Sequence, residues 1–110
     1  WNGAASGNWT YNIRWDSGTT LDSKMNNGEM ICVTYVTPVG GSSYYQTGFT
    51  IDGSSKTVQW VSNLPPVQAG GREAGDDAAT TGFDVYSFAI NKYSTNNYYI
   101  LGSHTHFGAY

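Results

Sequence analysis

The sequence predicts an all-β protein, an antiparallel β-sandwich or jelly-roll-like domain, and three observations lead to this fold class. Apolar and polar residues alternate with a period of two along most of the chain, and no stretch shows helical spacing. About six such runs are separated by turn signals rich in Gly, Asn, Asp and Ser. These signals recur at intervals too short for the crossover helices of a βαβ protein, so strands joined by turns are expected.

The first expected strand is WTYNIRW, residues 9–15. One of its faces carries the aromatic and apolar residues Trp9, Tyr11, Ile13 and Trp15. The other face is polar, which is typical of a half-buried strand.

The run EMICVTYVT, residues 29–37, follows the turn signal NNG and is apolar on both faces. Strands that are covered on both faces have this pattern, so we expect a central strand here. Cys32 is the only cysteine of the chain, which rules out an internal disulfide. We expect it to be a buried packing residue, because nothing beside it in sequence would activate a thiol.

Two hairpins are expected in the remainder of the chain. In YYQTGFTIDGSSKTVQWV, residues 44–61, two strands are joined at DGSS, because Asp-Gly between extended runs marks a tight turn. FDVYSFAINKY and YYILGSHTHF, residues 83–93 and 98–107, are joined by STNN and form the second hairpin. Between the hairpins, residues 62–83 lose the alternation and are rich in Pro, Gly and charge, so a long ordered loop is expected.

Composition favours one compact domain. The chain has 110 residues, of which 39% are hydrophobic and 12% charged, and a chain of this length buries roughly two thirds of its unfolded surface. The chain begins at Trp1 rather than Met, so we expect a piece of a longer polypeptide or a processed product. A net charge of −3 with five Lys and Arg argues against nucleic acid as a partner. No apolar run is long enough to span a bilayer, so membrane insertion is not expected.

The chain contains none of the common catalytic or nucleotide-binding motifs, and we therefore expect no enzyme activity. The loop segment GREAGDDA offers Arg72, Glu73, Asp76 and Asp77, which could supply carboxylates for acid–base chemistry or for calcium. Because their spacing matches no calcium loop, a solvated loop is the favoured interpretation and a small hydrolase the weakest one.

Aromatic residues make up 15% of the chain, more than one small core needs, so several are expected on the surface or in a subunit interface. Exposed rings beside polar groups are typical of sugar-binding sites. Trp60 and the pairs Tyr44–Tyr45 and Tyr98–Tyr99 are the candidate rings, although packing explains at least one member of each pair. The predicted ligand-binding residues are Trp60, Tyr45, Arg72, Asp76 and Asp77.

An ordered set of segments resembles a known family. The segments are NNGEMICVTYVT, SSYYQTGFTIDG, VQW leading to PPVQAGG, GFDVYSFAINKY and NNYYILGSHTHF. From Gly28 onward, about three quarters of the chain, they resemble a domain near the C-termini of fibre and spike-like structural proteins of tailed phages, many of them marine. The run GREAGDDAATTG is longer or more charged than that pattern.

This resemblance implies a virion structural protein, the homotrimeric knob of a tail fibre, head fibre or spike at the surface of the phage particle. It also implies that residues 1–8 are the exit from a preceding shaft or domain and that residues 9–110 form a single β-sandwich knob domain. Its expected partners are further copies of itself, other virion proteins and a host-surface glycan. A trimer interface would account for many aromatic and few charged residues. The alternative is a secreted monomeric carbohydrate-binding module of the lectin type.

His104 and His106 are the only histidines, and on a strand they point to the same face about 6.6 to 7 Å apart. One pair is half a metal site, whereas three pairs around a trimer axis, as the resemblance implies for some fibre and spike tips, would offer six imidazoles to a transition metal. The other interpretation is a polar strand face. A catalytic role is disfavoured, because no carboxylate or nucleophile lies beside either histidine in sequence. No other cofactor is expected.

Overall fold

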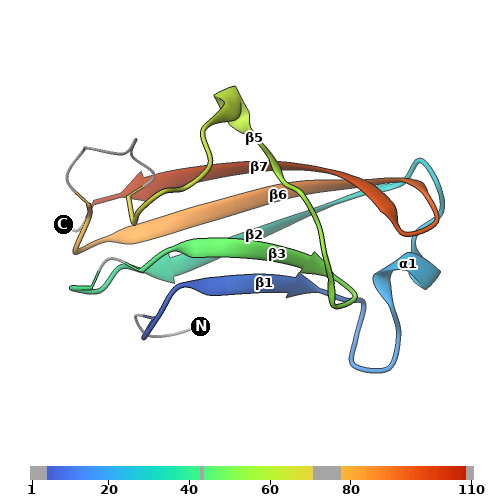
Figure 1. The fold of residues 1–110 in the computed structure, drawn as a ribbon, viewed down its shortest axis with the longest axis horizontal. Coiled ribbons are helices and arrows are strands. Elements are labelled where there is room, and N and C mark those ends of the chain that lie inside the picture. Colours follow the sequence, from blue (N-terminus) through green and yellow to red (C-terminus); the bar gives the residue numbers. More distant parts are fainter. Residues whose placement is uncertain (1–4, 43, 71–77, 109–110) are drawn as a thin grey trace.

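The computed structural model describes residues 5–42, 44–70 and 78–108, and it is a sandwich of two β-sheets (Figure 1). The first sheet has the strand order β1-β3-β4 and the second β2-β6-β7-β5. The first sheet comprises β1 (Trp9–Ile13), β3 (Gln46–Ile51) and β4 (Ser54–Ser55). The second comprises β2 (Met30–Pro38), β5 (Gln59–Trp60), β6 (Phe83–Ser94) and β7 (Asn97–Phe107). The predicted β-sandwich is confirmed.

Two strand pairs run parallel, which the expected antiparallel sheets did not include. The parallel pairs are β1–β3 and β5–β7. The antiparallel pairs are β2–β6, β3–β4 and β6–β7. The structure also contains one turn of helix, α1 (Leu21–Lys24), and one 3-10 turn, η1 (Val61–Asn63). Within the part of the chain that the structure describes, no helix has the length and apolar character needed to cross a membrane.

The β6–β7 hairpin is the longest feature of the sandwich and lies at the centre of its sheet. Its turn lies between Ser94 and Asn97, and Asn96 adopts a φ of 58°, a left-handed conformation that Asn tolerates better than most residues. Along β6 every second residue is buried, from Asp84 to Lys92. The predicted second hairpin is therefore confirmed.

The predicted first hairpin is confirmed only at its turn. Asp52 and Gly53 have φ values of 52° and 82°, as a tight hairpin turn requires. Only two residue pairs follow before the chain leaves this sheet and crosses to the other, where β5 pairs with β7. The Asp52 carboxylate also accepts hydrogen bonds from the backbone N–H groups of Leu21 (2.7 Å) and Asp22 (3.1 Å), which fixes the start of α1.

The core lies between the two sheets and is mostly aromatic and aliphatic. Its buried residues are Tyr11, Ile13, Leu21, Met25, Phe49, Ile51, Tyr86, Phe88, Ile90 and Ile100. Rings join the sheets directly: Tyr11 of β1 stacks on Tyr35 of β2 with centroids 4.0 Å apart, and Phe49 of β3 lies 4.6 Å from Phe88 of β6. The alternation predicted for the first strand is confirmed, although Trp15 falls beyond β1 and is exposed.

Strand β2 lies at the edge of its sheet, so the prediction of a central strand is wrong for the single chain. The prediction that Cys32 is buried is wrong as well, because Cys32 is exposed. Both predictions took apolar residues on two faces as a sign of cover on two faces. In this chain the first sheet covers the inner face alone, and the alternation places Cys32 on the outer face.

Candidate functional site

Two of the five predicted ligand-binding residues lie together. Tyr45 and Trp60 line the same groove of about 340 Å³, between β3 and β5, which Pro65 and Pro66 also border. We call it the Tyr45–Trp60 groove. Arg72, Asp76 and Asp77, with Glu73, lie outside the described residues.

Trp60 is also a packing residue. Its ring meets that of Phe88 edge-on, with centroids 5.7 Å apart. A Cβ atom added to Gly102 would lie 3.0 Å from two ring atoms of Trp60 and 2.7 Å from Val58. The indole therefore fills the space above Gly102, and the packing interpretation accounts for much of this ring.

The two histidines converge on a buried carboxylate that sequence reasoning did not pair with them. Asp84 lies opposite His106 in the β6–β7 register, and its side chain is 1% exposed. His106 Nδ1 lies 2.7 Å from Asp84 Oδ1. His104 Nε2 lies 3.0 Å from Oδ2, off the line of a good hydrogen bond. The expectation that both rings point to one face is confirmed, and that face is the interior of the sandwich.

The Asp84 carboxylate also holds the long loop. The backbone N–H of Gly70 is 3.1 Å from both carboxylate oxygens, and Ala79 donates to the carbonyl of Ala69 at 3.0 Å. Residues 64–70 and 78–82 contain no helix or strand, so the predicted loop is confirmed over the part that the structure describes. Asp84 thus ties this loop, at Gly70, to the central hairpin.

Opposing effects act on the pKa of Asp84. Burial alone would raise the pKa of this carboxyl, but the contacts with His104 and His106 and the Gly70 N–H outweigh burial and leave it below its usual value. His104 is further fixed by stacking on the Tyr86 ring, with centroids 4.2 Å apart. The carboxylate form of Asp84 is therefore the stable one at neutral pH.

Asp84 and the histidines have few chemical options beyond this contact. In the described residues, no hydrogen bond joins either imidazole to a Ser, Thr or Cys side chain. Nor is any group of three or more His, Cys, Asp or Glu side chains in that part of the chain arranged to hold a metal. An ion on a trimer axis would have to compete with Asp84 for these ring nitrogens, and such a metal stays a prediction. The sequence signal for Asp84 was an acidic residue at an inward position of an apolar strand.

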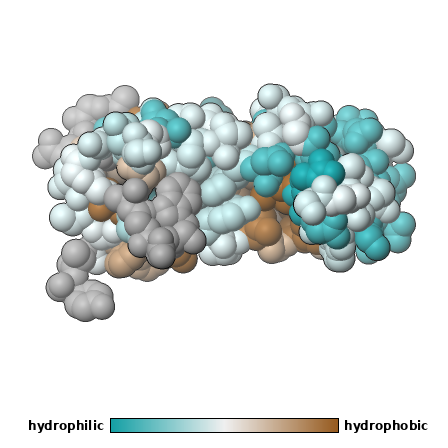
Figure 2. All heavy atoms as spheres, turned by 90° about the horizontal axis from the view of Figure 1, so that it is seen from below, coloured by the Kyte–Doolittle hydropathy of each residue, from teal (hydrophilic) through white to brown (hydrophobic). Residues whose placement is uncertain are grey.

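The outer face of the second sheet is the second candidate site. We define the outer face by the outward residues of β2, β6 and β7, which are Met30, Cys32, Thr34, Val36, Phe83, Val85, Ser87, Ala89, Asn91, Tyr93, Tyr99, Leu101, Ser103, Thr105 and Phe107. No charged residue is among them. Figure 2 shows the molecule from below, the side on which β1 lies in Figure 1, and hydrophilic residues gather there toward the α1 end.

Apolar side chains of the outer face form two clusters. Near the start of β6, Val36, Phe83 and Phe107 are 55%, 43% and 56% exposed. Near the turn end of the β6–β7 hairpin, the rings of Tyr93 and Tyr99 stack with centroids 4.5 Å apart. The prediction that surplus aromatic residues lie on the surface is confirmed.

Between the clusters the outer face is hollowed. Small side chains, Thr34, Ser87 and Ser103 among them, line a groove of about 460 Å³ that Trp60 and Val61 border on the side of β5. The hydroxyl oxygens of Thr34 and Ser87 are 3.3 Å apart. The outer face thus combines protruding apolar groups with a recess whose lining is mostly apolar and includes a few small hydroxyl side chains.

Comparison with known proteins adds no relative to these observations: no protein-family model, no curated protein and no solved structure matches this chain.

Proposed function

We propose that this domain is a self-assembling structural module, the homotrimeric knob of a phage tail fibre, head fibre or spike, whose copies meet through the outer face. The observation that carries the proposal is the absence of charge from the outer face, together with its apolar clusters. Subunit interfaces are depleted in charge and enriched in Tyr, Phe and Met in the same way. The resemblance described above supports the virion setting and the number of copies.

The exposed apolar area is of the size that association needs. Seven large side chains of the outer face are each about half exposed, namely Met30, Val36, Phe83, Tyr93, Tyr99, Leu101 and Phe107. At about 100 Å² apiece, judged from the 150–250 Å² that a buried ring covers, they offer about 700 Å². A standard interface buries about 800 Å² on each partner, so the apolar part alone approaches that value.

The solution mass of the domain tests this proposal. We expect three copies, or a multiple of three, at micromolar concentration by native mass spectrometry, and a strict monomer would contradict the proposal. Leu101→Lys places a charge in the outer face and should release monomers, because an unpaired charge is costly to bury in an interface. Ser55→Lys adds the same charge at an exposed position of the other sheet and should leave the assembly intact.

A secreted monomeric carbohydrate-binding module is the second candidate, and the Tyr45–Trp60 groove favours it. The groove is lined by hydroxyl, amide and aromatic groups and by one cation, Lys56, whose ammonium donates to the Asn96 carbonyl at 2.7 Å. A neutral sugar suits such a lining. Glycan-array binding that is lost in Tyr45→Ala, with a monomeric mass before and after, would favour this candidate over the knob.

A further inference from the structure

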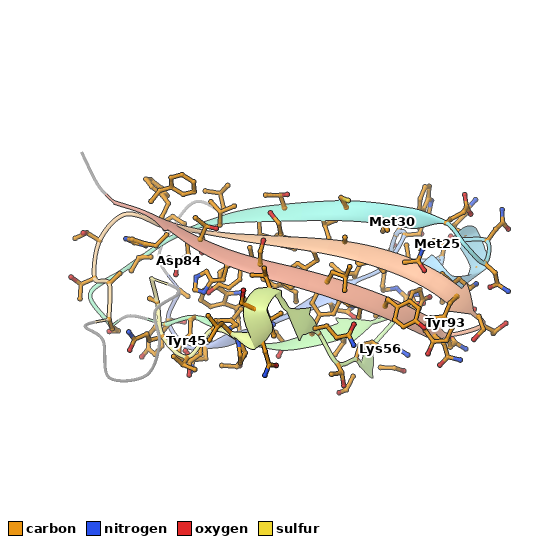
Figure 3. All side chains as sticks on the ribbon, turned by 90° about the horizontal axis from the view of Figure 1, so that it is seen from above. Met25, Met30, Tyr45, Lys56, Asp84 and Tyr93 are labelled. Carbon is orange, nitrogen blue, oxygen red and sulfur yellow. The ribbon has the colours of Figure 1, made fainter. Side chains whose placement is uncertain are left out.

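The free edge of β2 is unusual for a chain that stands alone. β2 pairs with β6 over nine consecutive residues without a bulge, and its other side has no strand beside it in the described chain. In Figure 3, β2 runs along one long side of the molecule. Natural proteins protect such edges with charges, bulges or proline. β2 has no charged residue, and its one proline, Pro38, is its last residue.

Alternation shows which backbone groups face the open side. Val39 donates to the carbonyl of Gly82 at 2.9 Å, so the odd-numbered residues of β2 are bonded to β6. The N–H and C=O groups of Cys32, Thr34 and Val36 therefore point away from β6. None of these groups has a backbone hydrogen bond to another element among the described residues.

Burial along the two neighbouring strands shows that the edge is open. The inward residues Ile31 and Val33 of β2 are only half-buried. Their partners on β6, Ile90 and Phe88, are 0% and 1% exposed. A further strand beside β2 would complete the cover of these side chains.

We propose that β2 pairs antiparallel with β2 of a second copy across a two-fold axis, which joins the two four-stranded sheets into one. This inference rests on the proposed self-assembly and adds a second contact to it: the outer face joins three copies, and the edge of β2 joins two such trimers. Pairing also places β2 inside a continuous sheet, as expected for residues 29–37, while the outer-face contact covers its second face.

The identity of the partner follows from which way side chains point. The residues of β2 with free backbone groups have their side chains on the outer face, so the partner strand must match that arrangement. On β7, the residues that face away from β6 are the even-numbered ones, and their side chains point inward. Pairing β2 with β7 of a neighbour would join an outer face to an interior. Pairing β2 with itself keeps both outer faces on the same side.

The register follows from Pro38, which has no N–H to donate. When the two-fold axis passes through Val33, Pro38 lies outside the paired region. Every backbone N–H and C=O group of residues 30–36 that points away from β6 then has a partner in the second copy. Cys32 then lies opposite Thr34 of the second copy, and Met30 lies opposite Val36. These contacts join uncharged side chains only. Directly opposite residues of this type have Cα atoms about 5.5 Å apart, within the range of a disulfide.

Cysteine crosslinking tests both the edge and the register. Thr34→Cys, with the native Cys32, should yield a covalent dimer under mild oxidation, because two disulfides can form across the axis. Cysteines two apart on one strand are about 6.6 Å apart and point the same way, which disfavours a bond within the chain. Ser55→Cys is the matched control on another edge and should stay uncrosslinked. Efficient self-crosslinking of the unmutated protein through Cys32 would overturn the register.

Thr34→Pro gives an independent test. It removes one N–H from the open edge and none from the β6 ladder, so the fold should survive by circular dichroism while the paired form is lost. Thr34→Ala should keep both. The unmutated protein should contain six copies, because the two-fold pairing of β2 joins each trimer to a second one. A trimer that Thr34→Cys does not crosslink would overturn this inference and leave the proposed function standing, whereas a monomer would overturn both.

Discussion

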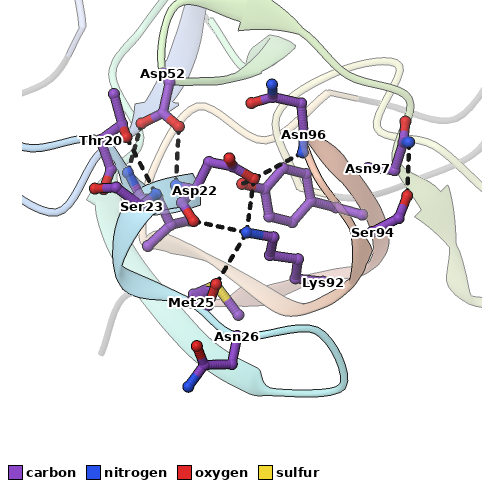
Figure 4. A network of polar contacts seen from close by, with 12 residues as sticks. Thr20, Asp22, Ser23, Met25, Asn26, Asp52, Lys92, Ser94, Asn96 and Asn97 are labelled. Carbon is purple, nitrogen blue, oxygen red and sulfur yellow. Dashed lines mark hydrogen bonds and ion pairs between the residues drawn. The ribbon is translucent and has the colours of Figure 1, made fainter.

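Strand β6 buries one charged residue near each end, and the two are held in different ways. Near the turn, the Lys92 ammonium lies 2.9 Å from the Asp22 carboxylate and donates to the carbonyls of Asp22 (2.6 Å) and Met25 (2.9 Å) (Figure 4). At the other end, Asp84 is held by two imidazoles and a loop N–H. Figure 3 places Met25 and Asp84 at opposite ends of the sandwich.

The comparison separates an end of the sandwich that is tied to α1 from an end that is tied to the long loop. Lys92 is surrounded by backbone carbonyls and one carboxylate, and Asp22 also accepts from the Asn96 N–H at 2.7 Å, so α1 and the β6–β7 turn are tied together. Asp84 is bound instead by the imidazoles of His104 and His106 in β7 and by the backbone N–H of Gly70 in the loop. The loop from residue 64 onward is attached at this second end.

Removing Lys92 should have the largest effect. Lys92→Ala removes the buried ammonium that binds the carbonyls of Asp22 and Met25 and the partly exposed Asp22 carboxylate, so it should lower the free energy of unfolding by about 3 to 4 kcal/mol. Urea unfolding measures the change. Lys24→Ala, which removes an exposed cation of α1, is the control and should change stability by no more than about 0.5 kcal/mol. Equal effects of the two variants would show that the turn end is not held by Lys92.

Removing the charge of Asp84 should lower the free energy of unfolding by less than the loss of Lys92. Asp84→Asn keeps the shape of the side chain but loses charge-assisted contacts with His106 and Gly70, so we expect a loss of about 2 to 3 kcal/mol. Amide hydrogen exchange at Gly70 should rise in this variant, because its acceptor is weakened. Unchanged exchange at Gly70 would mean that Asp84 does not hold the loop.

A fall in pH should lower the stability contributed by the contacts of Asp22 and by those of Asp84. The pKa values of Asp22 and Asp84 are both lowered, the first chiefly by the Lys92 ammonium and the second by its imidazole contacts against the effect of burial. A carboxyl with a lowered pKa stabilises the fold above its unfolded value of about 3.9 and loses this effect as pH falls through the folded value. The free energy of unfolding, measured from pH 6 to pH 3, should therefore fall less steeply in Asp84→Asn than in the unmutated protein. An identical slope would contradict the role of Asp84.

The smallest effect is expected at His106, whose side chain is 20% exposed. His106→Ala removes one contact of 2.7 Å while His104 and Gly70 remain, so a loss of about 1 to 1.5 kcal/mol is expected from urea unfolding. His106→Gln restores a donor and should recover part of it. A loss as large as that of Asp84→Asn would mean that the carboxylate acts through His106 alone.

Local signals predicted the parts of the fold that local chemistry determines. The alternation of β6, the Asn96 turn and the Asp52–Gly53 turn are all visible in sequence because their causes lie within a few residues. α1 was missed, because a single turn has no periodicity and its first N–H groups bind Asp52, about thirty residues away.

The pairing of Asp84 with His106 was missed for the same reason, since only the strand register brings them together. The clue that sequence did offer was a charge at an inward position, at both Asp84 and Lys92. The position of β2 was predicted wrongly because a pattern reports whether a strand is covered on both sides, and does not report which chain provides the cover.

The packing of Trp60 over Gly102 limits which substitutions this sequence can accept as it evolves. A side chain at position 102 meets the indole at 3.0 Å, so each position limits what the other can be. A large residue at 102 becomes acceptable only after Val58, which would lie 2.7 Å from the added Cβ, and Trp60 have both made room. Descendants of this gene should therefore keep Gly102 or exchange it together with positions 58 and 60, and intermediates with only Gly102 replaced should be rare.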